Sequence, residues 1–88
     1  GGTEISATDG IDVYPNPSAD RFNLTFDNID GIVNYTVYDA MGKEVANDAF
    51  VANGFAEETI NLAELANGVY TLQLNTIKGS FTEKLVKE

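Results

Sequence analysis

The 88-residue chain has neither cysteine nor histidine, and its five basic residues stand against fourteen acidic ones. Without cysteine, no disulfide bond can stabilise so small a domain. The absence of both residue types also removes the usual ligands of zinc and copper, the commonest general base and the most reactive nucleophile. The formal net charge of −9 argues against nucleic acid and anionic membranes as partners, because basic surfaces bind both.

Long apolar runs are also absent. No stretch approaches the roughly 20 residues that a membrane-spanning helix needs, and the chain does not open with the basic and then apolar regions of a secretory signal peptide. Hydrophobic residues nevertheless make up 43% of the sequence, which is too much for a disordered chain. We therefore expect one globular domain over residues 11–88, preceded by a flexible linker of small and polar residues at 1–10.

Apolar and polar residues alternate in short segments along the chain. Phe22, Leu24 and Phe26 alternate with polar residues, and a period of two is typical of a strand with one buried face. Residues 44–50 are a weaker case, because they include alanines. The segments that we expect to form strands are residues 11–13, 22–26, 33–37, 44–50, 60–62, 70–74 and 81–86.

Residues that favour turns separate these segments. We expect loops at residues 27–31 and 52–54, a tight hairpin at 40–43 in which Gly42 takes a positive φ, and corners at 67–68 and 78–80. Residues 62–67 have the spacing of one short helical turn. About seven short strands with turns every eight to twelve residues predict an all-β, antiparallel, Ig-like or fibronectin-like β-sandwich.

The sequence offers little for catalysis or cofactor binding. Its serines lie in linker or turn composition, where serine bonds the local backbone. Glu57 and Glu58 are adjacent in a strand pattern and so face opposite ways, which prevents them from acting as a carboxylate pair. We therefore expect neither an enzyme nor a cofactor site. Asp27 and Asp30 are weak calcium candidates, because their spacing does not fit an EF-hand loop, and the alternative is a solvated polar turn.

The aromatic residues divide into two groups. One group shares the apolar parity of its strand and is expected in the core, namely Phe22, Phe26, Tyr35, Tyr70 and Phe81. The other group is open between packing and an exposed row that binds sugar or protein, namely Tyr14, Tyr38, Phe50 and Phe55.

Four separate segments carry a more specific signal. They are Pro15, Asn16 and Pro17 after the first strand; Asp39, Gly42 and Lys43 in the hairpin; Gly68, Val69 and Tyr70; and Lys84, Leu85, Val86 and Lys87. In this order and spacing they resemble the type A C-terminal sorting domain of the type IX (Por) secretion system of Bacteroidota, over roughly residues 11–88. The sequence departs from the family at Asn61, where aspartate is usual, although an asparagine oxygen can still cap the turn that follows. The same segments could also be only what a small sandwich requires.

The resemblance implies a role as an address rather than a catalyst. Such a domain follows an N-terminal cargo domain, passes through the periplasm, and is recognised by the type IX translocon and an outer-membrane shuttle protein. In many members a surface sortase-like peptidase cuts ahead of the domain, here in the linker, and the cargo stays at the cell surface or becomes extracellular. The matched residues would be the partner-recognition residues.

Three hypotheses about mechanism follow. The terminal strand with Lys84 and Lys87 could lie at a sheet edge and pair with a receptor strand. Alternatively, the domain could be an Ig-like binding or adhesion module for carbohydrate or protein, which predicts an exposed aromatic platform or a calcium loop. A third alternative is a passive spacer beside the cargo domain.

Overall fold

The computed structural model describes residues 11–15 and 17–88, so the predicted linker at 1–10 and Asn16 lie outside the described residues. The described strands are β1 (Ile11–Tyr14), β2 (Arg21–Tyr38), β3 (Glu44–Asn61), β4 (Gly68–Thr76) and β5 (Gly79–Lys87). They pair antiparallel in the order β1-β2-β4-β5, and β3 pairs with the other side of β2. No helix in this part of the chain has the length and apolarity needed to cross a membrane.

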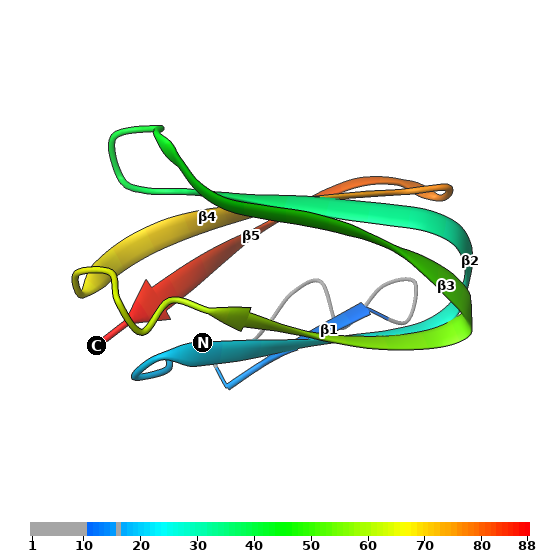
Figure 1. Ribbon diagram of the computed structural model, residues 1–88, viewed down its shortest axis with the longest axis horizontal. Coiled ribbons are helices and arrows are strands. Elements are labelled where there is room, and N and C mark those ends of the chain that lie inside the picture. Colours follow the sequence, from blue (N-terminus) through cyan, green and yellow to red (C-terminus); the bar gives the residue numbers. More distant parts are fainter. Residues whose placement is uncertain (1–10, 16) are drawn as a thin grey trace.

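Two long strands create the two layers. β2 and β3 form one antiparallel hairpin that curves over at the right of Figure 1, so each strand runs through both layers. In the lower layer, the first half of β2 pairs with β1, as Ile11 opposite Phe26 illustrates. In the upper layer, the second half of β2 pairs with β4, as Asn34 opposite Asn75 illustrates, and β5 lies beyond β4. The result is the predicted all-β sandwich.

The bend in β2 and β3 corrects the predicted strand count. Residues 27–31 and 52–54 do not form loops, because pairing continues through them with one register shift between Asp27 and Ile29. Asn28 is the extra residue and adopts a φ of 64°, which is the geometry of a β-bulge. Gly31, with a φ of 103°, continues the curve beside it. Residues predicted to break the strands therefore bend them, and seven expected segments become five strands.

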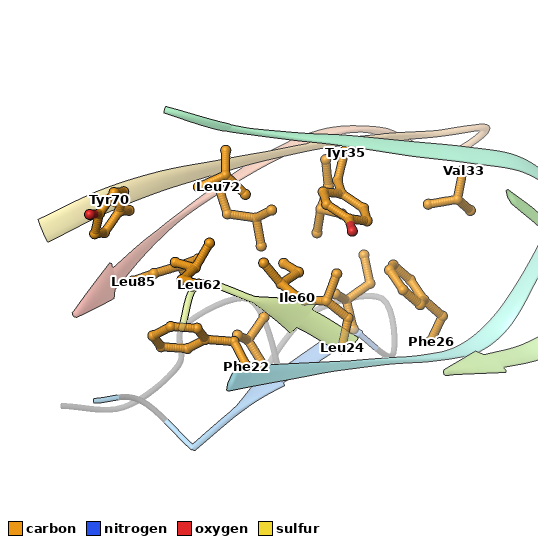
Figure 2. Close-up of a cluster of buried hydrophobic side chains, with 14 of the residues drawn as sticks. Phe22, Leu24, Phe26, Val33, Tyr35, Ile60, Leu62, Tyr70, Leu72 and Leu85 are labelled. Carbon is orange, nitrogen blue, oxygen red and sulfur yellow. The ribbon is translucent and has the colours of Figure 1, made fainter. Parts of the chain in front are cut away.

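The core fills the space between the layers. Figure 2 shows buried side chains from both layers pointing toward one another. Phe26 and Phe50 meet edge to face with ring centroids 5.6 Å apart, and Phe81 packs half-buried against the cluster. The predicted alternation is confirmed by the fully or nearly buried residues Ile11, Val13, Phe22, Leu24, Phe26, Val33, Tyr35, Val37, Ile60, Leu62, Tyr70, Leu72, Leu74 and Leu85.

The connection between β3 and β4 is a turn and not a helical one. One backbone hydrogen bond forms within it, from the Leu65 N–H to the Leu62 carbonyl at 3.0 Å. The Oδ1 atom of Asn61 accepts a hydrogen bond from the Ala63 N–H at 2.9 Å. The expected asparagine cap therefore forms, but the backbone continues into β4 before a helical turn is complete.

Candidate functional site

The four segments singled out in the sequence gather at one end of the sandwich, at the left of Figure 1. The hairpin at 39–43 lies in the upper layer, whereas the turn at 62–67 and the chain after β1 lie in the lower one. The carboxyl end of β5 reaches the same end, because Gly68 at the start of β4 pairs with Lys87. We call this surface the motif end, and it comprises residues 15, 17–20, 39–43, 62–70 and 84–88.

The proline corner brings the chain after β1 onto β5. Pro15 and Pro17 are exposed, and the peptide bond before Pro15 is cis. Ser18, which follows, donates its N–H to the Val86 carbonyl and accepts from the Glu88 N–H, both at 3.0 Å. Ser18 therefore occupies the outer edge of β5 at its carboxyl end, so the predicted open edge for a receptor strand does not exist there.

The same segment also reaches the lower layer. The Asp20 carbonyl accepts a hydrogen bond from the Leu62 N–H at 2.8 Å. The Ser18 hydroxyl donates to the Arg21 carbonyl at 2.5 Å. Residues 17–20 therefore join the last strand to the turn after β3. No local sequence pattern indicates this role, because the partners of Ser18 and Asp20 lie more than forty residues away in the chain.

Tyr70 fixes the turn from inside. Its side chain is 6% exposed, and its hydroxyl donates to the Ala66 carbonyl at 2.5 Å. This contact ties β4 to the turn that precedes it, as the tyrosine corner does in other β-sandwiches. Gly68 lies between them with a φ of 154°. These two predicted recognition residues therefore shape the motif end, and the buried ring leaves little of Tyr70 for a partner to touch.

The terminal residues face alternately inward and outward. Leu85 is fully buried, Val86 is half-buried and Lys84 is exposed. Lys87 is only 8% exposed, and its Nζ donates to the Oδ1 atom of Asn67 at 3.0 Å. Lys87 shares the inward parity of Phe81 and Leu85, which was visible in the sequence. Of the two terminal lysines, Lys84 therefore presents its side chain to solvent.

The β2–β3 hairpin is held by one carboxylate. The Oδ1 atom of Asp39 accepts hydrogen bonds from the N–H groups of Met41 and Lys43, each at 2.9 Å. The Asp39 carbonyl accepts from the Gly42 N–H at 3.0 Å, and Gly42 has a φ of 85°. The predicted positive φ at Gly42 is confirmed. The side chain of Lys43 is exposed at the rim of the motif end.

An open hollow of about 210 Å³ lies between the two layers at this end. Val45 and Leu65 supply its apolar lining, and Asn61 and Glu64 supply its polar lining. All four come from the two ends of β3 and the turn that follows it. Side chains of this mixture suit one apolar group of a partner together with a hydrogen-bond donor.

The remaining candidates lie away from the motif end. Asp27 and Asp30 are exposed at the bend, and no three acidic side chains in residues 11–15 and 17–88 come together as a metal site. Tyr14 and Phe55 are exposed on the lower layer but oppose different residues of β2, Asn23 and Asp27. The uncertain aromatics therefore form no single row.

The protonation equilibrium of the Tyr35 phenol is shifted. Burial raises the pKa of the Tyr35 phenol, and the nearby carboxylates of Glu58 and Asp48 raise it further. Tyr35 therefore stays protonated and neutral inside the sandwich at physiological pH.

Comparison with known proteins agrees with this geometry. The family model described as "Secretion system C-terminal sorting domain" matches residues 12–88. A solved structure of a DUF3244 family protein from Bacteroides vulgatus, with an immunoglobulin-like β-sandwich fold, superposes with a TM-score of 0.75 at 21% identity. That comparison covers 89% of this chain and 84% of the other. Among curated proteins, no match is found. The chain therefore belongs to the type IX secretion C-terminal sorting domain family, and it is a signal that directs its attached cargo protein out of the cell.

Proposed function

We propose that the export machinery recognises this domain through the motif end as a preformed surface. The supporting observation is that three segments far apart in the sequence, at residues 17–20, 62–67 and 84–88, are hydrogen-bonded to one another through Ser18, Asp20 and Asn67. These hydrogen bonds fix the surface before a partner binds, which reduces the conformational entropy lost on binding. The receptor would contact the exposed Lys43 and Lys84 and would fill the hollow beside Leu65.

In this proposal the domain works by being bound and catalyses nothing. The described serine hydroxyls support this view, because Ser18 donates to the Arg21 carbonyl and Ser80 donates to the Oδ1 atom of Asn75. Neither hydroxyl is bonded to a group that could act as a general base for nucleophilic attack. The binding partners would be the type IX translocon and an outer-membrane shuttle protein, met in the periplasm. A sortase-like peptidase at the surface would then cut ahead of β1.

The test must separate recognition from folding. Deleting residues 84–88 would not do so, because it removes the fully buried Leu85 and the bonds to Ser18. Glu64→Lys instead changes an exposed side chain that lines the hollow. Glu57→Lys makes the same charge change at an exposed position on the lower layer. Both variants should keep the melting temperature of the parent.

The readout is delivery of a reporter that carries each variant at its carboxyl end, in a host with type IX secretion. We expect Glu64→Lys to leave the reporter in the periplasm and Glu57→Lys to export it normally. Normal export by both variants would overturn recognition through the hollow, while family membership would stand on the sequence match.

A further inference from the structure

One edge of β3 is open to a further strand. Among the described strands β3 pairs only with β2, and within residues 11–15 and 17–88 no backbone hydrogen bond joins β3 to another segment. Alternate residues of such a strand point their N–H and C=O groups away from the neighbouring strand, which makes the edge a template for another strand. The open edge predicted for the last strand therefore lies at β3 instead.

The bend divides this open edge into two halves. Gly54 lies in the bend with a φ of 85°, so one straight strand can pair with only one half. In the lower layer, residues 55–61 include the adjacent carboxylates of Glu57 and Glu58. In the upper layer, residues 46–51 include one charged residue, Asp48. The upper half is therefore the better template, because fewer charges oppose pairing.

Asp48 occupies one N–H group of the upper half. The Ala49 N–H donates to the Oδ1 atom of Asp48 at 2.8 Å, so this N–H group lies on the open edge. A further strand can pair with Ala49 only after the carboxylate has turned to another partner. In the lower layer, Glu58 accepts from the Thr59 N–H in the same way, at a longer 3.3 Å.

Asp48 and Glu58 flank the same part of the space between the layers. Asp48 lies opposite Tyr35 on the inner face of the upper layer, and Glu58 lies opposite Leu24 on the inner face of the lower layer. Figure 2 shows the Tyr35 hydroxyl pointing from the upper layer toward Leu24. The Tyr35 side chain is 6% exposed, and its hydroxyl has no hydrogen-bond partner among the described residues. Two carboxylates and one phenol therefore border the open side of the sandwich.

This set of groups suits a guanidinium group. Each carboxylate uses one oxygen for a backbone N–H and keeps the other for a partner. An arginine offers five N–H donors in a planar fork that matches carboxylate oxygens, and the phenol oxygen accepts a further hydrogen bond. A calcium ion fits less well, because no three acidic side chains come together in residues 11–15 and 17–88.

We propose that the upper half of the β3 edge binds an extended segment of a partner protein that places an arginine between Asp48 and Glu58. The partner is a polypeptide, because a second strand offers N–H and C=O groups at the spacing of the edge. The arginine takes the Asp48 carboxylate from the Ala49 N–H, which then pairs with the incoming strand. This contact is separate from the motif end and does not depend on it.

The same carboxylates exclude other strands. A strand without a basic residue would desolvate Asp48 and Glu58 without giving them a partner, so specificity comes from the strands that are rejected as well as the one that is accepted. A second copy paired through β3 meets this obstacle, because β3 carries Glu44, Asp48, Glu57 and Glu58 and no basic residue.

Matched peptides test the proposal on the purified chain. The probe is a peptide of about seven residues, in which threonine and valine alternate around a central arginine. The control peptide carries citrulline, the neutral isostere of arginine, at the centre. We expect the arginine peptide to shift the amide resonance of Ala49, and the citrulline peptide to bind at least about tenfold more weakly. An unmoved Ala49 resonance at about 5 mM arginine peptide would overturn the proposal.

Two neighbouring substitutions provide matched variants. Glu58→Gln removes an inward carboxylate, whereas Glu57→Gln removes an outward carboxylate of the same strand. Both changes are isosteric, and the amide oxygen at position 58 still accepts from the Thr59 N–H, so both variants should melt like the parent. We expect Glu58→Gln to weaken binding of the arginine peptide at least about fivefold and Glu57→Gln to change it less than about twofold. Equal affinities of the two variants would refute a role for the inward carboxylate.

Two controls on the parent chain identify wrong occupants. Sedimentation without peptide should show a monomer, and a dimer that the arginine peptide dissociates would overturn the proposal in favour of a second copy. Calcium chloride at about 5 mM should leave the Ala49 resonance in place. A shift with calcium that Glu58→Gln abolishes would overturn the proposal in favour of a metal site.

Discussion

The two ends of the sandwich are held together in different ways. At the motif end, hydrogen bonds join segments that are far apart in the sequence, as between Ser18 and Val86 or between Asp20 and Leu62. At the opposite end, β2 and β3 pass from one layer to the other without a break (Figure 1). There the edge-to-face contact of Phe26 with Phe50 and the buried Ile29 supply the packing.

This difference explains why the family signal is concentrated at one end. At the bend, backbone pairing holds the two strands together, and the positive φ angles of Asn28 and Gly31 set the curve. The motif end depends on particular residues, such as a tyrosine at position 70 whose hydroxyl reaches Ala66. The same residues therefore serve the fold and the surface that we propose for recognition, and experiments must separate the two roles.

The largest effect should come from removing the Tyr70 ring at the motif end. Tyr70→Ala empties a buried site, and we expect a loss of about 3–5 kcal/mol in the free energy of unfolding. Tyr70→Phe keeps the ring and loses only the hydroxyl bond to the Ala66 carbonyl, which should cost about 1 kcal/mol. Urea denaturation of both variants measures these values. Equal losses in the two variants would show that the hydroxyl, and not the packing, holds this end.

A smaller effect is expected at the bend. Gly31→Ala places a Cβ on a residue with a φ of 103°, which costs about 1–2 kcal/mol. The new atom would also lie 2.9 Å from the Cγ2 atom of Ile77. In a Gly31→Ala/Ile77→Ala double variant, the steric part should disappear and the conformational part should remain. Full recovery of the parent stability in the double variant would contradict a strained backbone at Gly31.

Much of the fold follows from local sequence. The alternation at residues 22–26, 33–37 and 70–74 predicted the core residues correctly, because a strand with one buried face alternates apolar and polar residues along consecutive positions. The continuity of β2 and β3 could not be predicted in that way. Asn28 and Gly31 favour loops locally, and only pairing with residues 52–56 turns them into a bend. Long-range pairing thus overrides the turn preference.

The motif end shows the same limit. The sequence identified Gly42, Gly68, Tyr70 and the terminal strand, but not how they join. Lys87 was expected to present its charge to a receptor, whereas its ammonium group lies against Asn67. Sequence patterns describe neighbouring residues, whereas the hydrogen-bond partner of Lys87 lies twenty positions away along the chain. The alternation of buried and exposed residues along the last strand indicates that Lys87 is buried, but it does not indicate the bond to Asn67.

The strand β3 runs through both layers between the two ends and pairs only with β2 among the described strands, so its other edge is an edge of the sheet. Asp48 and Glu58 lie on the inward parity of this strand, one in each layer. Charged side chains that point inward on an edge strand oppose pairing with another sheet. They also lie close enough to Tyr35 to raise its pKa. The pKa of Tyr35 is therefore sensitive to the packing of the two layers between the two ends.

The smallest effect should appear as a pH dependence from Tyr35. Its pKa is higher in the folded protein than the ordinary value of 10.0, first through burial and then through Glu58 and Asp48. The folded state therefore holds the phenol proton more tightly than the unfolded state. This contribution to stability is complete below about pH 10 and is lost as the pH rises above it. Denaturation at pH 9, 10 and 11 should show a steeper fall for the parent than for Tyr35→Phe, with Glu58→Gln between them. Identical slopes for the parent and Tyr35→Phe would mean that the phenol is as well solvated as in the unfolded chain, and that the layers open between the two ends.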